Sequence, residues 1–338
     1  MMTIYLGILA IISLIGVKLN KTGDDSYLDK EHSTSLKGIF VAVILLSHFN
    51  QYITIENTVF NYPYLLFFER IGQLMVTPFL FFSGYGVMLS IDKKKGYLNS
   101  FLKNRVIKTL IHFDLAVVLY YLMNLILGIN YSVNPLLVLI GWDSVGNSNW
   151  YIFVLLCLYL ITYLVFTLFK NNKRLLQLIV LSLFSLALIG LLIMTKSDYW
   201  YDTIPAYVLG VWYYCYKDVM NKVLNKYYWI ILIVSALLTG ALNILGYRGY
   251  GVANVINSAV FCILLLAVTF KLEINNPIIG LLGNYVFEIY ILQRIPYTIL
   301  ATMNLNVQLF FVLSVMILIG LTFVFRKLAN LITNVIIK

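Results

Sequence analysis

Long apolar runs follow one another along almost the whole chain, each close to the length of a bilayer-crossing helix. Crossing the hydrocarbon core takes about 20 apolar residues. Runs of this kind fall at residues 1–18, 36–55, 71–91, 106–128, 150–169, 175–194, 203–217, 227–245, 252–270, 278–302 and 307–326. The chain is 61% hydrophobic and only 11% charged, against about 25% charged residues in soluble domains. The sequence therefore predicts an all-α, polytopic transmembrane bundle of about eleven helices.

The first run has neither a basic segment before it nor a small-residue cleavage site after it. We therefore expect residues 1–18 to be a retained transmembrane helix rather than a signal peptide. Residues 36–326 are expected to form the main membrane domain and residues 327–338 a cytoplasmic tail. Cys157, Cys215 and Cys262 lie inside apolar runs without metal-ligand spacing, so no metal site is expected.

Lysine and arginine concentrate in alternate loops, and short cytoplasmic loops hold such an excess. The basic residues outside these loops are Arg70, Lys196, Arg248 and Arg294. This alternation predicts an N-terminus outside the cytoplasm and a C-terminus inside it. The net charge of +10 then reflects topology and attraction to anionic lipid. A nucleic-acid partner is not expected, because no soluble basic face is present.

A lysine and a histidine lie on one face of the second run. His48 follows Lys37 by eleven residues, which is roughly 16 Å along a helix and about 20° around it. In a helix over 36–55, Lys37 lies at the cytoplasmic mouth and His48 near the bilayer midplane. Burying an ionisable group there is costly, so a general-base role is favoured for His48 over a structural hydrogen bond. Lys37 is equally well explained as a positive-inside anchor.

A second basic set begins the fourth run. Arg105, Lys108 and His112 are spaced i, i+3 and i+7, which places them on one face of an α-helix. With Lys37, they are predicted to hold the phosphates of an anionic, nucleotide-like donor at the inner surface. Contact with lipid headgroups is the alternative.

These residues, with two further motifs, resemble the acyltransferase 3 family of membrane enzymes that O-acylate sugars and lipids using acyl-CoA. Lys37 to His48 reproduces the family's R/K-x10-H spacing, and Arg105-Val-Ile-Lys108 resembles its R-x-x-R element. FLFFSGYGVML resembles its F-x-SGF/Y helix and LGNYVFEIYILQ its late segment. The resemblance covers roughly residues 35–325, so the first helix precedes the family's usual ten. Lys108 replaces an arginine, and Gln293 stands where histidine is common, which leaves acid–base chemistry to His48.

The resemblance implies acyl-CoA, expected to be acetyl-CoA, entering from the cytoplasm, with no tightly bound cofactor. The acyl group would pass to a hydroxyl of a surface or lipid-linked polysaccharide, such as a capsule, at a bacterial plasma membrane. His48 would accept the hydroxyl proton, with or without a covalent acyl-enzyme. The oligomeric state stays open. A flippase for a lipid-linked glycan and a catalytically degenerate sensor are the rival readings. The flippase reading is disfavoured because the chain shows no second copy of these motifs, and transporter folds commonly contain internal repeats. Gln293 is the best support for the sensor reading.

Several other residues are secondary candidates. Glu288, near the middle of the tenth run, is expected either to orient His48 or to form a structural pair with His48, Arg294 or another polar group. Ser83 and Tyr85 lie in a small polar notch, Ser-Gly-Tyr-Gly, which favours close helix packing and alternatively borders an acyl path. Trp142 and Trp150 flank a polar outer loop and are equally consistent with sugar stacking and with interfacial anchoring. His32 is expected to be solvated in a charged loop.

Overall fold

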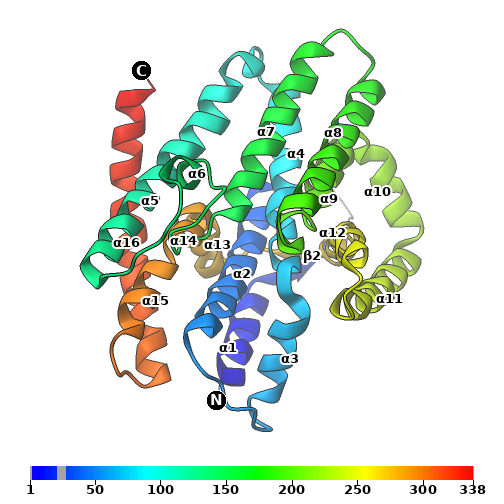
Figure 1. Cartoon of the computed structure of the whole chain (residues 1–338). Coiled ribbons are helices and arrows are strands. Elements are labelled where there is room, and N and C mark those ends of the chain that lie inside the picture. Colours follow the sequence, from blue (N-terminus) through cyan, green and yellow to red (C-terminus); the bar gives the residue numbers. More distant parts are fainter. Residues whose placement is uncertain (1, 21–27, 338) are drawn as a thin grey trace. The chain divides into compact units, whose positions relative to one another are not determined.

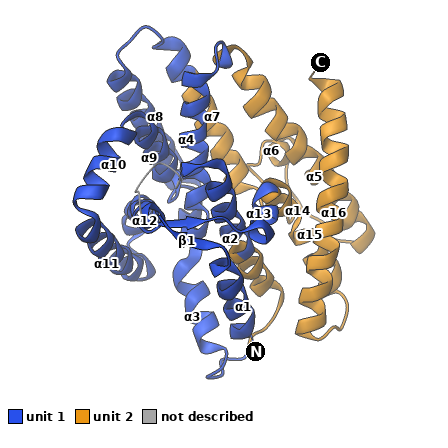
Figure 2. Ribbon diagram, turned by 180° about the vertical axis from the view of Figure 1, so that it is seen from behind, with its two compact units in different colours: residues 1–42, 56–97, 164–284 blue, residues 43–55, 98–163, 285–338 orange. Residues whose placement is uncertain are grey.

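The computed structural model describes residues 2–20 and 28–337, which are mostly helical (Figure 1). The helices group into two compact units that alternate along the sequence (Figure 2). Unit 1 comprises residues 1–42, 56–97 and 164–284, and unit 2 comprises residues 43–55, 98–163 and 285–338. Two helices pass from one unit into the other, namely α2 (Lys30–Phe49) and α7 (Trp150–Leu168).

Within its described residues, unit 1 contains eleven helices besides parts of α2 and α7, and a short two-stranded sheet. The helices are α1 (Met2–Leu14), α3 (Tyr62–Ile71), η3 (Gly72–Met75), α4 (Thr77–Lys93), α8 (Arg174–Thr195), η6 (Asp198–Trp200), α9 (Ile204–Cys215), α10 (Lys217–Lys226), α11 (Tyr228–Tyr247), α12 (Gly251–Lys271) and α13 (Pro277–Asn284). The strands β1 (Val17–Leu19) and β2 (Leu272–Ile274) pair antiparallel, with Lys18 opposite Glu273.

Unit 2 is built mainly on long helices. Its elements are η2 (Asn50–Tyr52), a π-helix η5 (Leu102–Ile107), α5 (Lys108–Leu127), α6 (Pro135–Leu139), α14 (Val286–Leu292), α15 (Arg294–Ala301) and α16 (Val307–Ile336), with η4 (Tyr97–Ser100) at its boundary with unit 1. The sequence predicted a tail after residue 326, but α16 continues to Ile336. Leu328, Leu331, Ile332 and Val335 continue the apolar spacing of a helix there.

The described residues contain eight helical segments long and apolar enough to cross a membrane, or nine if the broken segment 277–301 is counted as one. These segments and the shorter helices α1 and α9 fall on the predicted runs, which agrees with an all-α polytopic bundle. α1 and α9 have only 13 and 12 residues, less than the length that a bilayer core requires. The count of eleven and the orientation therefore remain predictions.

The second helix begins earlier than the apolar pattern indicated. α2 starts at Lys30, because the polar residues before the apolar run continue the helix, and η2 extends the segment to Tyr52. One continuous helix does carry both Lys37 and His48. However, Lys37 lies about two turns inside that helix, and His48 lies in its last turn rather than in its middle.

His32 is part of this extension and is not solvated. Its side chain is 2% exposed, and its Nδ1 accepts a hydrogen bond of 2.9 Å from the backbone N–H of Ile274 in β2. The expectation of a loop histidine was wrong because hydrophobic periodicity does not detect a polar turn that packs against a strand. His32 holds the two-stranded sheet against α2.

The notch in α4 is a site of close helix packing, as the sequence favoured. A Cβ atom at Gly84 would fall within contact distance of the Tyr207 carbonyl oxygen of α9. Reciprocally, a Cβ at Gly210 of α9 would collide with the Phe81 carbonyl of α4. Small residues at both positions therefore let the two backbones touch.

Gly84→Ala is expected to destabilise the protein by about 1–3 kcal/mol, because the added methyl group forces α4 and α9 apart. Gly86→Ala is the matched control, since a Cβ there meets no atom within 4 Å and alanine is the better helix former. Thermal unfolding in detergent measures both variants. Equal melting temperatures for the two variants would contradict the packing described.

Candidate active site

The C-terminal end of α2 and the junction of α14 with α15 bring a polar cluster together in unit 2. The imidazole of His48 lies with its ring centroid 6.3 Å from that of Tyr290. Gln293 and Arg294, the residues at the α14–α15 break, are its polar and charged neighbours. His48 is half-buried, while its neighbours Tyr290 and Gln293 are buried. We call His48, Tyr290, Gln293 and Arg294 the imidazole cluster.

Three buried atoms of the imidazole cluster have no hydrogen-bond partner in the part of the chain that the structure describes. They are Nδ1 of His48, Oε1 of Gln293 and the hydroxyl oxygen of Tyr290. The Gln293 amide is oriented by its Nε2, which donates to the Tyr290 carbonyl at 3.1 Å. Buried polar groups in native proteins are nearly all paired, and unpaired ones require an explanation. A bound hydroxyl-bearing substrate would provide the missing partners.

The guanidinium of Arg294 is held in place by residues from two other segments. Its Nε donates to the hydroxyl of Ser148 at 3.1 Å, and its Nη2 donates to Oε1 of Gln51 at 2.7 Å. The hydroxyl of Tyr120 in α5 donates to the Ile291 carbonyl at 3.1 Å and fixes the end of α14. Arginine has five N–H donors, so donors remain for an anionic oxygen near His48.

Glu288 lies in a different cluster from His48. Its buried carboxylate pairs with Arg326 of α16, with Oε1 at 3.7 Å from Nε. Lys108 contributes a second positive charge nearby, and the Arg326 guanidinium covers the Tyr285 ring at 4.4 Å. Of the alternatives that the sequence left open, the structure therefore shows a pair with Arg326. Among the described residues, no contact between Glu288 and His48 supports a role for Glu288 in orienting the imidazole.

The predicted basic face on the fourth run is altered by the π-helix. The i, i+3, i+7 argument assumed α-helical geometry, but η5 has wider turns, and Lys108 N–H bonds to the Lys103 carbonyl. Arg105 is half-buried with its guanidinium 5.8 Å from the Tyr159 ring centroid, and Lys108 is exposed. His112 is buried, with its ring edge-to-face to Phe287 and Phe325. The three residues thus differ in environment and do not form one accessible face.

Lys37 and Tyr85 belong to unit 1. Lys37 is half-buried in α2. Tyr85 is buried, packs edge-to-face on Tyr214, and borders a polar cavity of about 670 Å³. Arg174 and Asp92 form an ion pair of 2.6 Å at this cavity. Several lining residues lie at helix ends next to loops rich in lysine and arginine, so the predicted side of the cavity is cytoplasmic. Ser83 is half-buried in the same notch.

The loop between α6 and α7 uses most of its polar groups to stabilise itself. The Ser144 hydroxyl donates to the Asn147 carbonyl at 2.8 Å, and Nδ2 of Asn149 donates to the Gly141 carbonyl at 2.8 Å. Trp142 packs edge-to-face on Phe153, and Trp150 begins α7. Both tryptophans are half-buried. The loop reaches the imidazole cluster through Ser148, whose hydroxyl accepts from Arg294.

Sequence reasoning missed Tyr290, Ser148 and Gln51 in this site. Arg294 entered only as a partner for Glu288. A signal for it was present, because a charged residue inside an apolar run is a functional candidate in its own right. Ser148 and Gln51 lie in ordinary polar segments, and only tertiary structure shows that they hold Arg294.

The family model of the acyltransferase domain matches residues 31–326. This range contains every candidate residue named above and most of the chain. Comparison with curated proteins and with solved structures gave no match. The apolar helices and the family match together indicate a multi-pass membrane acyltransferase. The chain belongs to the acyltransferase 3 family.

Proposed function

We propose that this protein is an acyl-CoA-dependent O-acyltransferase of a bacterial plasma membrane. It moves an acetyl group from cytoplasmic acetyl-CoA to a hydroxyl of a surface or lipid-linked polysaccharide. The observation that carries this proposal is the buried, unpaired Nδ1 of His48 in a polar cluster beside Arg294.

The reaction needs a base for the acceptor and stabilisation of negative charge. The acceptor hydroxyl oxygen bonds to the thioester carbonyl carbon while His48 takes the hydroxyl proton. The carbonyl oxygen becomes an oxyanion, for which a free N–H of Arg294 is the available donor. The C–S bond then breaks, and the leaving thiolate takes the proton from the imidazolium. The products are an O-acetyl ester and CoA with a free thiol.

The donor's phosphates require cations on the cytoplasmic side. Lys37, Arg105 and Lys108 serve this purpose in the proposal, with Lys108 the most exposed of the three. His112 is buried between aromatic rings and supports α5 rather than contacting phosphate. Arginine offers a bidentate fork to phosphate and lysine a point charge.

The test is the ester content of the cell's surface polysaccharide with and without this protein. Cells that produce the protein are expected to carry O-acetyl groups that deletion cells lack, and NMR of the extracted polysaccharide measures them before and after mild alkali. Re-expression of the wild-type chain restores the esters. An unchanged ester content in deletion cells would refute the proposed acceptor class.

A further inference from the structure

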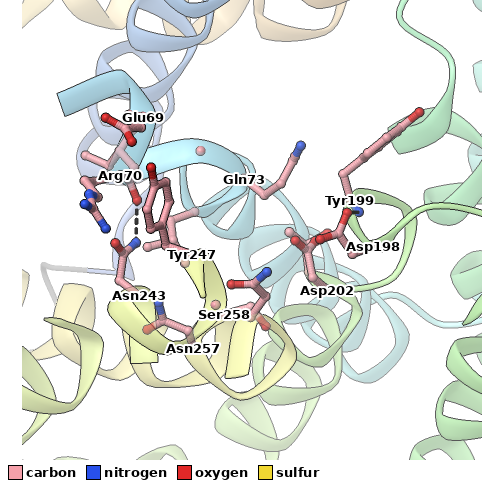
Figure 3. Close-up of a pocket in the computed structure, with 16 residues that line it drawn as sticks. Glu69, Arg70, Gln73, Asp198, Tyr199, Asp202, Asn243, Tyr247, Asn257 and Ser258 are labelled. Atoms are coloured by element: carbon pink, nitrogen blue, oxygen red, sulfur yellow. Dashed lines mark hydrogen bonds between the residues drawn. The ribbon is translucent and has the colours of Figure 1, made fainter. Parts of the chain in front are cut away.

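A polar pocket of about 250 Å³ lies within unit 1, and no residue of the imidazole cluster lines it (Figure 3). Its walls come from the α3–η3 junction, the η6 segment, the end of α11 and the start of α12. Each of these lies at, or next to, a loop on the side poor in lysine and arginine. That distribution predicts an extracytoplasmic opening.

Some polar groups of the pocket already have partners. Nδ2 of Asn243 donates to the Arg70 carbonyl, as the dashed line in Figure 3 shows. The Arg70 guanidinium lies 4.0 Å from the Tyr247 ring centroid. Oδ1 of Asp198 accepts from the Tyr199 N–H at 2.9 Å. These contacts fix the rim of the pocket.

Three buried residues of the lining keep a polar atom without any partner among the described residues. Asp202, Thr203 and Asn257 are 4%, 1% and 1% exposed, yet Oδ1 of Asp202, Oγ1 of Thr203 and Oδ1 of Asn257 are unpaired. Leaving such atoms unpaired is unfavourable, because each has lost its hydrogen bonds to water without replacing them. Figure 3 shows Asp202 and Asn257 on opposite sides of the pocket, with Ser258 between them. A ligand with several hydroxyl groups would satisfy atoms on both sides.

The carboxyl of Asp202 suits a hydroxyl ligand for a second reason. Burial, together with the neighbouring Asp198, raises the pKa of Asp202 well above its ordinary range. A carboxyl that retains its proton can donate as well as accept. A sugar hydroxyl has the same dual capacity.

Other ligand classes fit less well. No group of three His, Cys, Asp or Glu side chains suitable for a metal ion occurs in the described part of the chain. Glu69 and Asp198 add negative charge while Arg70 is the one basic residue of the lining, which disfavours a phosphate or a carboxylate. The volume is below the roughly 300 Å³ at which drug-sized pockets begin. An uncharged, compact, polyhydroxylated group fits these properties.

We infer that this pocket binds one uncharged sugar residue of a glycan on the extracytoplasmic side. Oδ1 of Asn257 and Oγ1 of Thr203 accept from sugar hydroxyls, and the Asp202 carboxyl completes the contact. The exposed ring of Tyr199 offers an apolar face to sugar C–H groups. The inference that this sugar belongs to the acetyl acceptor rests on the proposed function. The inference that the pocket binds a sugar does not depend on it.

The test is saturation-transfer NMR on the purified full-length protein with glucose, galactose, mannose, N-acetylglucosamine and glucuronic acid as probes. At least one neutral sugar is expected to bind, and glucuronic acid to bind at least about tenfold more weakly, since each 1.4 kcal/mol is tenfold. Asn257→Leu and the isosteric Thr203→Val are each expected to weaken binding about tenfold. Thr239→Val is the matched control, because its hydroxyl is also unpaired but lies outside the pocket.

The result separates this inference from the enzymatic proposal. His48→Ala is expected to bind the same sugar with unchanged affinity, because His48 is not part of the pocket. No binding of any neutral probe to the wild-type protein would overturn the inference, as would unchanged binding by Thr203→Val and Asn257→Leu. Acetyl transfer to glycan by a wild-type protein that binds none of the probes would leave the proposed function standing and remove only the pocket.

Discussion

His48→Ala is expected to lower acetyl transfer by about 10²–10⁴-fold, the range typical of losing a general base. Neither of the other two imidazoles is expected to substitute, because His112 is buried against Phe287 and Phe325 and His32 accepts a hydrogen bond from the Ile274 N–H. The measurement is O-acetyl ester on the surface polysaccharide, normalised to the amount of protein in the membrane. The folded amount should stay near wild type, since Nδ1 of His48 has no partner to lose.

His32→Gln is the matched control for this variant. The Ile274 N–H loses its acceptor, which is expected to cost about 1–3 kcal/mol of stability. Transfer per folded molecule should nevertheless be unchanged. Wild-type ester levels in His48→Ala cells would remove His48 from the mechanism, whatever the control showed.

Arg326→Met is expected to destabilise the protein by roughly 2–3 kcal/mol. The substitution leaves the buried Glu288 carboxylate, whose side chain is 8% exposed, without its paired charge. Breaking a fully buried pair costs about 3–5 kcal/mol, and the value here is lower because the Arg326 side chain is 38% exposed. Thermal unfolding in detergent is the measurement.

The double variant Glu288→Gln/Arg326→Met tests the cause. Replacing the carboxylate by a neutral amide removes the uncompensated charge, so the double variant should recover more than half of the lost stability. A double variant as unstable as Arg326→Met, or less stable, would show that Arg326 acts through its packing on Tyr285 instead.

The fold class could be predicted because transmembrane helices are specified by long apolar runs. The helix boundaries could not be predicted where polar residues continue a helix, as at Lys30–Ser35. They could not be predicted either where a helix is shorter than its apolar run, as in α9. The small residues at Ser83–Gly86 favoured a close helix contact, but only the structure shows that α9 is the partner. The π-helix at Leu102–Ile107 has no marker of its own in the sequence, so the shared face of Arg105, Lys108 and His112 was wrongly assumed.

The candidate site, like the fold, could be predicted only in part from the sequence. His48 was identifiable because one ionisable residue in an apolar helix is conspicuous. Its neighbours were not, because Gln293 was noted only as a departure from the family's histidine and Ser148 only as part of a polar loop. The partner of Glu288 is 38 residues away in sequence, and helix spacing gives no information at that separation. The pocket around Asp202 and Asn257 combines four segments of unit 1 and is visible only in three dimensions.

The most direct measurement is transfer of radiolabelled acetyl from acetyl-CoA to lipid-linked glycan by the purified protein in vesicles. The wild-type protein is expected to place alkali-labile label on the glycan, and His48→Ala to place about a hundredth of it or less. Equal labelling by the two proteins, or none by the wild type on a glycan that is O-acetylated in the cell, would contradict the account.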